Sequence, residues 1–539
     1  MNKKNIYFGS LLIVTLLLSG CASDDASDKT QGTNAPTGIV TFATAAEGGT
    51  RTSAKYTGSG LDFYWTVNDK IWAKDDNGNY NASVDNDIAT RIAAVPGSNS
   101  TAKAKFHVSG LYTGTTHKVR YTGMNGTKDK VVIKPSQTQN TPNDAIHIAD
   151  DGDFGVADAT GSGSYNFTLN HKAAYVTFMP HTTDTYITGA KIKKITLWSG
   201  NENDHLAGTF DIDDDGVLSG ATSATNRVSL VVNNFPVSAT TNYIANAATM
   251  VIAPGTYNNV AIEYTLEVPT ASGPLTGTIT KLYPSVTFDA GKNTPVRTDL
   301  KVNKVYLGNE YYQWDAQQRM WEGHEWNNPN PSLRQQPSEN MMTTPYTPPS
   351  GSSSHYREDP ANPSGIYPAA NHSAANCPNV NEMIWYCMQG APHWDIELWV
   401  TMGHLYAGGM WFKKKSNIAG FTDTNYGGTD YRTQNPYSTI TNNNVIQGKP
   451  SDLNNYFYLP ALGVYGVRSN SPYLGEFALA GNWGYYWSST SKTGVGADSR
   501  LSAFSIGFNG SNVNVYDIYS REGGFPQFYI TNEDEFRPF

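Results

Sequence analysis

Residues 482–490 read NWGYYWSST, a stretch that is rich in large aromatic side chains and carries no charge. Successive side chains of a strand point to opposite faces, so Tyr485 and Trp487 share one face and Tyr486 lies on the other. We expect a core strand here, with Trp487 buried. Trp483 follows a turn and is expected to be the more exposed ring. What the stretch does depends on the segments around it.

Upstream of this strand, NVNEMIWYCMQG (379–390) has the features of a helix. Asn379 can accept hydrogen bonds as an N-cap, Glu382 stands three residues later as in a capping box, and Gly390 can end the helix. A long polar stretch rich in Asn, Thr, Tyr and Gly follows at 413–455, and apolar strands come after it. The order is therefore a helix, an irregular region and then strands.

This order is similar to the C-type-lectin-like fold, and the phrases CPNVNEM, PHWD, YFYLPALG and YYWSST resemble the Fibrobacter-type major paralogous domain. We assign residues 306–539 to such an α+β module, including a Pro/Ser-rich loop at 327–365 that is too poor in aliphatic residues to build a core. The resemblance implies that the long irregular region carries recognition. The alternative is an ordinary polar loop covering the core. The candidate ligand-binding residues are Asn425, Tyr426, Tyr431, Arg432 and Tyr437, with Trp483 in the neighbouring turn.

Residues 38–305 read as strands throughout, without helical periodicity before residue 300. GIVTFATA (38–45) is an isolated extended segment, and Asn77-Gly78 marks a hairpin turn between two strands. SYNFTLNHKAAYVTFMP (164–180) begins a second set of strands. We expect two all-β sandwiches, at 38–160 and 161–305.

The N-terminus has the pattern of an export signal. Lys3 and Lys4 precede an apolar segment too short for a stable membrane anchor, and Leu18-Ser19-Gly20-Cys21 resembles a bacterial lipobox. The resemblance implies a signal peptide at 1–21, lipidation of Cys21 and a tether at 22–37. An ordinary secretory signal with an incidental cysteine is the alternative.

The lipobox, the lone strand, the loop around Arg51 and the phrases FYWTVNDKIW and FTLNHKAAYVTF together resemble the fimbrillin-type pilins. This resemblance implies two transthyretin-like sandwiches, a lipoprotein precursor at the outer membrane and cell surface, and removal of strand 38–45 by a protease that cuts after Arg51. It also implies other pilin subunits as partners, through donor-strand exchange. Because the end of the second sandwich, near Leu300, runs on into the module, the subunit is expected to accept a strand and not to donate one.

The remaining motifs do not indicate catalysis or a cofactor. Asp211 to Gly216 matches half of a calcium loop, but Thr222 stands where a bidentate Glu is needed, so a polar hairpin turn is favoured. His393 and His404 are interpreted as structural, and Cys377 is not expected to bond Cys387, because the helix rise of about 1.5 Å per residue separates them. No metal site is expected.

A formal net charge of −9 without a basic run after the first residues makes nucleic acid an improbable partner. The sequence therefore predicts a non-catalytic surface adhesin, placed at the tip of a strand-exchange pilus and presenting a lectin-like module to a glycan or protein. The alternative is a solitary surface lipoprotein that captures glycans for nutrient uptake.

Overall fold

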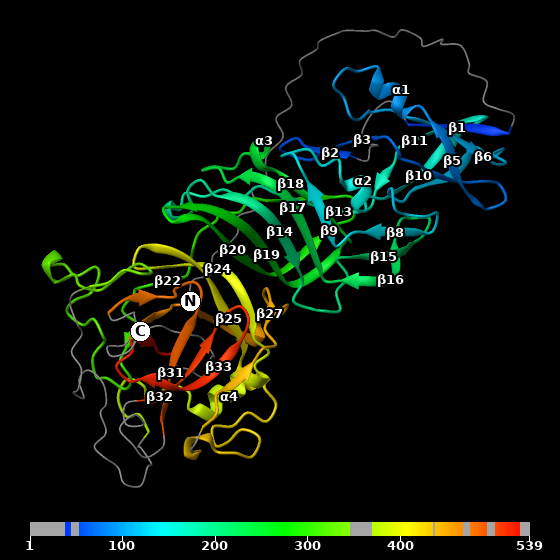
Figure 1. Ribbon diagram of the computed structural model, residues 1–539. Coiled ribbons are helices and arrows are strands. Elements are labelled where there is room, and N and C mark those ends of the chain that lie inside the picture. Colours follow the sequence, from blue (N-terminus) through cyan, green and yellow to red (C-terminus); the bar gives the residue numbers. More distant parts are fainter. Residues whose placement is uncertain are drawn as a thin grey trace, which may run out of the picture.

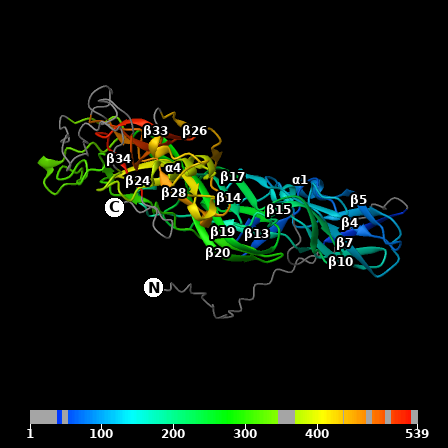
Figure 2. The same cartoon turned by 90° about the horizontal axis from the view of Figure 1, so that it is seen from below.

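The computed structural model describes residues 38–44, 53–344, 369–434, 437–466, 475–492 and 502–528. Strands predominate in this part, which confirms the mostly-β class. Three lobes follow one another in a row in both views, with the N-terminal domain and the C-terminal module at opposite ends (Figures 1 and 2). Cys21, Arg51, the tether and residues 345–368 of the Pro/Ser-rich loop lie outside the described residues.

The N-terminal domain is built on one sheet whose order is β11-β1-β6-β5-β4-β7-β10-β12. Its elements are β1 (Ile39–Thr44), β4 (Trp72–Lys74), β5 (Tyr80–Asn86), α1 (Ile88–Ala93), β6 (Lys105–Ser109), β7 (Thr116–Tyr121), β10 (Gly155–Gly161), β11 (Ser164–Phe167) and β12 (Asn170–His171). β10 pairs with β11 as well as with β7, so the pairing closes into a ring where the sequence predicted two separate sheets. The predicted hairpin turn is confirmed between β4 and β5, where Gly78 has a φ of 82°.

The central domain packs several sheets around one extensive core. Its elements are β2 (Ser53–Tyr56), β3 (Leu61–Tyr64), β8 (Lys130–Ile133), β9 (Ser136–Gln139), α2 (Ile148–Asp151), β13 (Ala174–Phe178), η1 (Thr185–Ile187), β14 (Lys191–Trp198), β15 (Ala207–Ile212), β16 (Leu218–Thr225), β17 (Arg227–Pro236), α3 (Tyr243–Asn246), β18 (Ala248–Ile252), β19 (Gly255–Thr270), β20 (Gly273–Phe288) and β21 (Asn293–Val296). The short helices α1, α2 and α3 lie in the region where the sequence shows no helical periodicity. Each is too short for helical periodicity to show in the sequence.

The two β domains interleave along the chain, so the expected boundary near residue 160 does not match the packing. β8 pairs with β15 and β9 pairs with β17, while Ala54, Val131 and Ile148 belong to the core of the central domain. In the other direction, β11 and β12 follow residue 160 and pair within the N-terminal domain. The chain therefore passes between the two cores more than once before it settles in the central domain.

A clamp of charged and phenolic groups joins these two domains. The predicted polar turn is confirmed between β15 and β16, and its Asp214 carboxylate accepts hydrogen bonds from Lys74, Tyr80 and Arg120 of the N-terminal domain. Burial acts to raise the pKa of Asp214, but the hydrogen bonds from these three side chains outweigh it and lower the pKa to about 2. The turn therefore serves as an interdomain contact, and the described residues contain no group of side chains suited to a metal ion.

The C-terminal module holds the longest helix of the described chain and a further set of strands. Its elements are β22 (Val305–Tyr306), β23 (Tyr311–Tyr312), η2 (Pro331–Leu333), α4 (Val380–Gln389), β24 (His393–Thr401), β25 (His404–Lys413), η3 (Lys415–Asn417), η4 (Tyr431–Thr433), β26 (Ile440–Asn442), β27 (Ile446–Gln447), η5 (Leu453–Asn455), β28 (Tyr456–Pro460), β29 (Val464–Tyr465), β30 (Phe477–Ala478), β31 (Gly484–Ser491), β32 (Ser502–Phe508), β33 (Val513–Ser520) and β34 (Phe525–Pro526). Among the described residues, no helix has the length and apolar character needed to span a membrane.

The predicted helix and core strand of the module are both confirmed. The Asn379 side chain accepts from the backbone of Glu382, whose own side chain accepts from Asn379, which completes the capping box of α4. In β31, Tyr485 and Trp487 face one cluster of buried residues and Tyr486 faces another. The strand is thus buried on both faces. This explains why consecutive positions, which point to opposite faces, all carry aromatic side chains.

The described start of the Pro/Ser-rich loop, residues 327–344, is held against the module. Gln336 is buried, and its amide donates to the Gly308 carbonyl and to the Tyr465 hydroxyl. Asn340 exchanges hydrogen bonds with the backbone of Ala480. This part is therefore attached to the folded module, where the composition indicated only a loop or a spacer.

Candidate functional site

β1 is joined to the N-terminal domain by strand pairing and by its buried side chains, and within the described chain no hairpin turn connects it to either neighbouring strand. It lies antiparallel to β6 and parallel to β11, so that Phe42 stands opposite Phe106 on one side and Tyr165 on the other. Both neighbours are distant in sequence, and a parallel neighbour cannot be reached by a tight hairpin. No local turn among the described residues therefore ties β1 to its partners.

The side chain that fixes β1 in the core is Phe42, which is completely buried. Its ring stacks on Tyr165 at a centroid distance of 5.1 Å and meets Tyr112 edge-on at 5.2 Å. Removing β1 would leave this pocket open and would expose the backbone N–H and C=O groups of both neighbouring strands. Such an open edge readily pairs with another extended segment.

The chain that follows β1 is held by the other domain. In β2, Ala54 donates a backbone hydrogen bond to the Ala145 carbonyl over 3.3 Å, and Tyr56 exchanges two hydrogen bonds with the Asn143 side chain. Of the residues that the structure describes, only those of β1 belong to the N-terminal domain and precede residue 53. A cut in the segment between β1 and β2 would separate β1 and leave β2 and the described chain that follows it in place.

The far end of the central domain offers no extended segment free for donation within the described residues. β21 pairs with β13, after which the Leu300 N–H donates to His181 over 2.8 Å and the Val302 N–H donates to Asp184 over 2.9 Å. β22 then pairs with β24 of the module. The backbone from the central domain into the module is therefore engaged.

Five of the six candidate ligand-binding residues gather beside α4. The Asn425 carbonyl accepts from the Trp385 indole over 2.9 Å, and the Tyr426 ring meets that indole at 5.0 Å. Tyr431 and Tyr437 lie 6.1 Å apart between ring centroids. Arg432 is exposed and pairs with Asp430 of the same loop. These residues form one surface, and ligand contact there stays a prediction.

Part of this surface is already committed to the fold. The Tyr437 hydroxyl donates to the Val515 carbonyl over 3.0 Å, and its ring meets Phe504 edge-on. The side-chain hydrogen bonds from Arg432 lower the pKa of Asp430 to about 2, so the pair stays charged and closed over a wide pH range. The Asn425 side chain donates to Thr424 and accepts from the Gly428 N–H, and the Tyr426 hydroxyl accepts from Gln389, so these two residues are also held by contacts within the module.

Trp483 is not brought to the other five. It is half-buried and stacks on Tyr485 at 5.5 Å, in a cluster on the opposite face of β31 from the core that supports Tyr426 and Tyr431. Trp487 is fully buried, as predicted.

Both cysteines of the module are free thiols in the interior. Cys377 lies among the residues around Trp487, whereas Cys387 lies in the core under α4 and donates to the Val513 carbonyl. Burial raises the pKa of Cys387 to about 12. A thiol with so little thiolate character is a poor nucleophile, so its role is packing.

A buried charged cluster lies where the central domain meets the module, a contact that we call the module junction. The Lys449 ammonium sits 2.7 Å from Asp395, 2.7 Å from Glu397 and 3.1 Å from Glu263. It also donates to the Thr278 hydroxyl over 3.0 Å. Burial acts to lower the pKa of Lys449, but the three carboxylates outweigh it and hold that pKa above its usual range.

Sequence reasoning missed this cluster, although half of its signal was visible. Asp395 and Glu397 stand two positions apart in the apolar strand DIELWV, so both carboxylates point to the same face. If that face is buried, the two carboxylates need a cation or hydrogen-bond donors. Their cation comes from a loop more than fifty positions further along the chain, and Glu263 comes from another domain. Only the tertiary structure identifies those partners.

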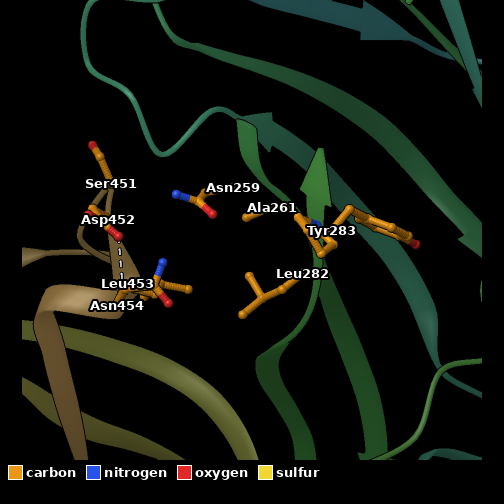
Figure 3. Close-up of a pocket in the computed structure, with 9 residues that line it drawn as sticks. Asn259, Ala261, Leu282, Tyr283, Ser451, Asp452, Leu453 and Asn454 are labelled. Carbon is orange, nitrogen blue, oxygen red and sulfur yellow. Dashed lines mark hydrogen bonds between the residues drawn. The ribbon is translucent and has the colours of Figure 1, made fainter. Parts of the chain in front are cut away.

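A hollow of about 550 Å³ lies at the module junction between residues 269–272 of the central domain and residues 403–407 of the module. Two other hollows of the module junction adjoin each other. The smaller, of about 210 Å³, is shown in Figure 3, where Asn259 faces the Ser451–Asp452 turn and Leu282 points across the gap toward Leu453. The larger, of about 630 Å³, shares Ser451 and Asp452 with the first and lies between the loop at 200–202 of the central domain and the module. The junction is thus both a rigid contact and a recessed surface.

Comparisons with known proteins assign no family to the chain and find a loose structural similarity to bacterial proteins. No protein-family model matches the sequence, and no curated protein matches it. Among solved structures, a candidate cell adhesion protein from Bacteroides ovatus is 16% identical, with a TM-score of 0.27, and the match covers 44% of this chain and 85% of that one. A second candidate cell adhesion protein, from Bacteroides fragilis, is 13% identical with a TM-score of 0.27, covering 49% and 94%.

The fimbrial anchor protein Mfa2 from Porphyromonas gingivalis is also similar, at 11% identity and a TM-score of 0.18 over 45% of this chain and 78% of that one. Superpositions at these TM-scores are too loose to transfer a function. The function is therefore inferred from the chain's own geometry.

Proposed function

We propose that this protein is a non-catalytic surface adhesin that joins a pilus by accepting a strand in place of β1. The observation that carries the proposal is the isolation of β1, which pairs on both sides, fills the core with Phe42 and is followed by a chain anchored in another domain. A protease that cuts after Arg51 would release β1 alone. The resulting groove would then take an extended segment from another subunit.

We further propose that the subunit sits at the tip. The chain between β21 and β22 is engaged by hydrogen bonds, so a donor strand would have to come from elsewhere. The β1 groove and the module lie at opposite ends of the molecule (Figures 1 and 2). A subunit held by the first end would present the second end outward, which suits a binding module.

Two measurements on native surface material test these proposals. N-terminal sequencing should find chains that begin at Thr52, and immunogold labelling should mark the ends of pili. Labelling along the shafts would refute tip placement. Material that begins only at lipidated Cys21 would instead support the solitary glycan-capturing lipoprotein.

A strand-complementation experiment tests the groove directly. Protein cut after Arg51 and freed of β1 should bind a synthetic GIVTFATA peptide and regain stability. The matched control is the same peptide carrying Phe42→Ala, which keeps the backbone ladder but leaves the buried pocket empty, and which should bind at least tenfold more weakly. Equal binding of the two peptides would contradict a groove defined by Phe42.

A further inference from the structure

The larger hollow at the module junction has walls from two domains. Glu202 comes from the loop after β14 in the central domain, and His393, Lys413 and Tyr456 come from strands of the module. Its volume of about 630 Å³ falls in the range of small-molecule sites, which run from about 300 to 1,000 Å³. Neither domain alone would form this site.

Several polar groups of this hollow have no partner within the described part of the chain. The Lys413 ammonium and the Glu202 carboxylate make no hydrogen bond or ion pair there, and the Tyr456 hydroxyl makes no hydrogen bond there. The His393 ring is fixed by a hydrogen bond from one nitrogen, Nδ1, to the Gly448 carbonyl at 3.1 Å. Its ring meets Tyr456 edge-on at 5.4 Å, which orients the tyrosine ring beside the hollow.

The walls are held in place by buried contacts immediately behind them. Lys449, which lines the hollow, is 1% exposed at its side chain and is fixed by three carboxylates. The Trp198 indole of the central domain donates to the Ser451 carbonyl over 3.1 Å, and Arg227 stacks on that indole at 4.2 Å. The hollow is therefore preorganised, which lowers the entropic cost of ligand binding.

The charges of the hollow select the class of ligand. Lys449 is saturated by its own carboxylates, and Asp452 accepts hydrogen bonds from the turn that it caps. Among the described lining residues, this leaves one cation without an ion pair, Lys413, against two carboxylates without one, Glu202 and Asp452. Without a positive excess the hollow offers little to phosphate, sulfate or a polyanion, whereas hydroxyl groups can both donate to Glu202 and accept from Lys413.

We propose that this hollow binds a neutral saccharide, with hydroxyls hydrogen-bonded to Glu202 and Lys413 and one sugar face against the ring of Tyr456. The inference rests on the proposed adhesive function and gives it a receptor class. It also moves recognition from the surface beside α4 to the module junction. A longer saccharide would pass Ser451 and Asp452 into the smaller hollow of Figure 3.

The test uses the unlipidated chain, residues 22–539, and saturation-transfer NMR with a defined set of monosaccharides. The neutral members are glucose, galactose, mannose, fucose, N-acetylglucosamine and N-acetylgalactosamine, and the anionic members are glucuronic acid and glucose 6-phosphate. At least one neutral sugar should bind. Tyr456→Ala and Glu202→Gln should each lower the affinity for that sugar by about tenfold or more, since each removes a direct contact.

Tyr186→Ala is the matched control, because it removes an exposed tyrosine from the central domain without touching this hollow. Its affinity should equal that of the unchanged protein. Glu202 lies in an exposed loop, so Glu202→Gln should not disturb folding. It therefore reports on the site even if the Tyr456→Ala protein fails to fold.

Three results would overturn the inference: no binding of any neutral sugar, binding restricted to the anionic sugars, or affinity unchanged by both variants. Loss of binding only on replacing Tyr426 and Tyr431 by Ala would also overturn it, by placing recognition beside α4. Pilus labelling of cells that make Glu202→Gln separates the two proposals. If the Glu202→Gln protein labels pili normally but does not bind sugar, the pilus role is retained. If the unchanged protein does not label pili, only the pilus role is refuted.

Discussion

Replacing Lys449 by Met should weaken the module junction more than any surface ion-pair change. Met keeps much of the aliphatic volume but removes the ammonium that neutralises Asp395, Glu397 and Glu263. The Lys449 side chain is 1% exposed and Asp395 is 2% exposed, so solvent cannot take over the role of the cation. Removing one partner of a buried ion pair costs about 3–5 kcal/mol.

We expect the lower end of that range, about 3 kcal/mol, because some donors remain. The Trp411 indole still donates to Asp395 over 3.0 Å, and threonine hydroxyls on β20 lie near Glu397. In the unchanged protein the raised pKa of Lys449 keeps the contribution of its ammonium fully present below about pH 10, the unfolded value, so that contribution is lost only above this pH.

Backbone hydrogen exchange on β24 and β28 is the suitable assay, because it reports local opening in a protein with several domains, where a single unfolding free energy is poorly defined. Lys301→Met is the matched control. Its ion pair with Asp299 spans 2.8 Å, but both side chains are largely exposed and screened by solvent, so a much smaller loss is expected. An opening free energy at β24 that is the same in both variants would refute the reasoning. Adding Glu397→Gln to the Lys449 variant should recover part of the loss.

Three further changes test other contacts. Asp214→Asn should cost about 1 kcal/mol of local opening free energy at pH 7, as expected for a partly exposed clamp, seen as faster hydrogen exchange in β15 and β7. The difference from the unchanged protein should shrink as pH falls from about 4 toward 2, through the depressed pKa of Asp214. Phe42→Ala should destabilise the N-terminal domain by about 3–5 kcal/mol, seen as faster hydrogen exchange in β6 and β11 with no change in the module. Gly277→Ala should open the module junction, because its Cβ would lie 2.3 Å from a Leu398 methyl, and exchange should rise in β24; unchanged exchange would show that the strands can shift apart freely.

The elements that the sequence predicted well are those specified by neighbours along the chain. The capping box of α4 lies within four residues, the β4–β5 turn depends on Asn77-Gly78, and the burial of Trp487 follows from alternation within one strand. In each case the physical cause is local, so the pattern is complete in the sequence. The same holds for β1, which reads as an isolated extended segment.

The features that were mispredicted or missed depend on the choice of distant partners. β8 and β9 have ordinary strand patterns, but nothing in those patterns indicates that they pair with β15 and β17 rather than within the N-terminal domain. The candidate ligand residues beside α4 were found from composition, and the fold gathers five of them. Trp483 was grouped with them because its turn was expected to lie next to the irregular region. In the structure, however, Trp483 and the other five residues lie on opposite faces of β31.

The contact between the N-terminal and central domains and the module junction together decide how such a subunit would respond to a pulling force. Domains within one chain usually move relative to one another unless the interface is large and well packed. Here the N-terminal and central domains share strands of interleaved sequence and the Asp214 clamp, while the central domain and the module share a strand contact between β20 and β24 and the buried Lys449 cluster. A pull applied between the β1 groove and the module must pass through both contacts. Because each combines strand pairing with well-ordered hydrogen bonds between charged groups, bending between the domains has to break several of these contacts together. The saccharide site proposed at the module junction would then keep its geometry while the protein is stretched, since both of its walls are fixed to the same charged cluster.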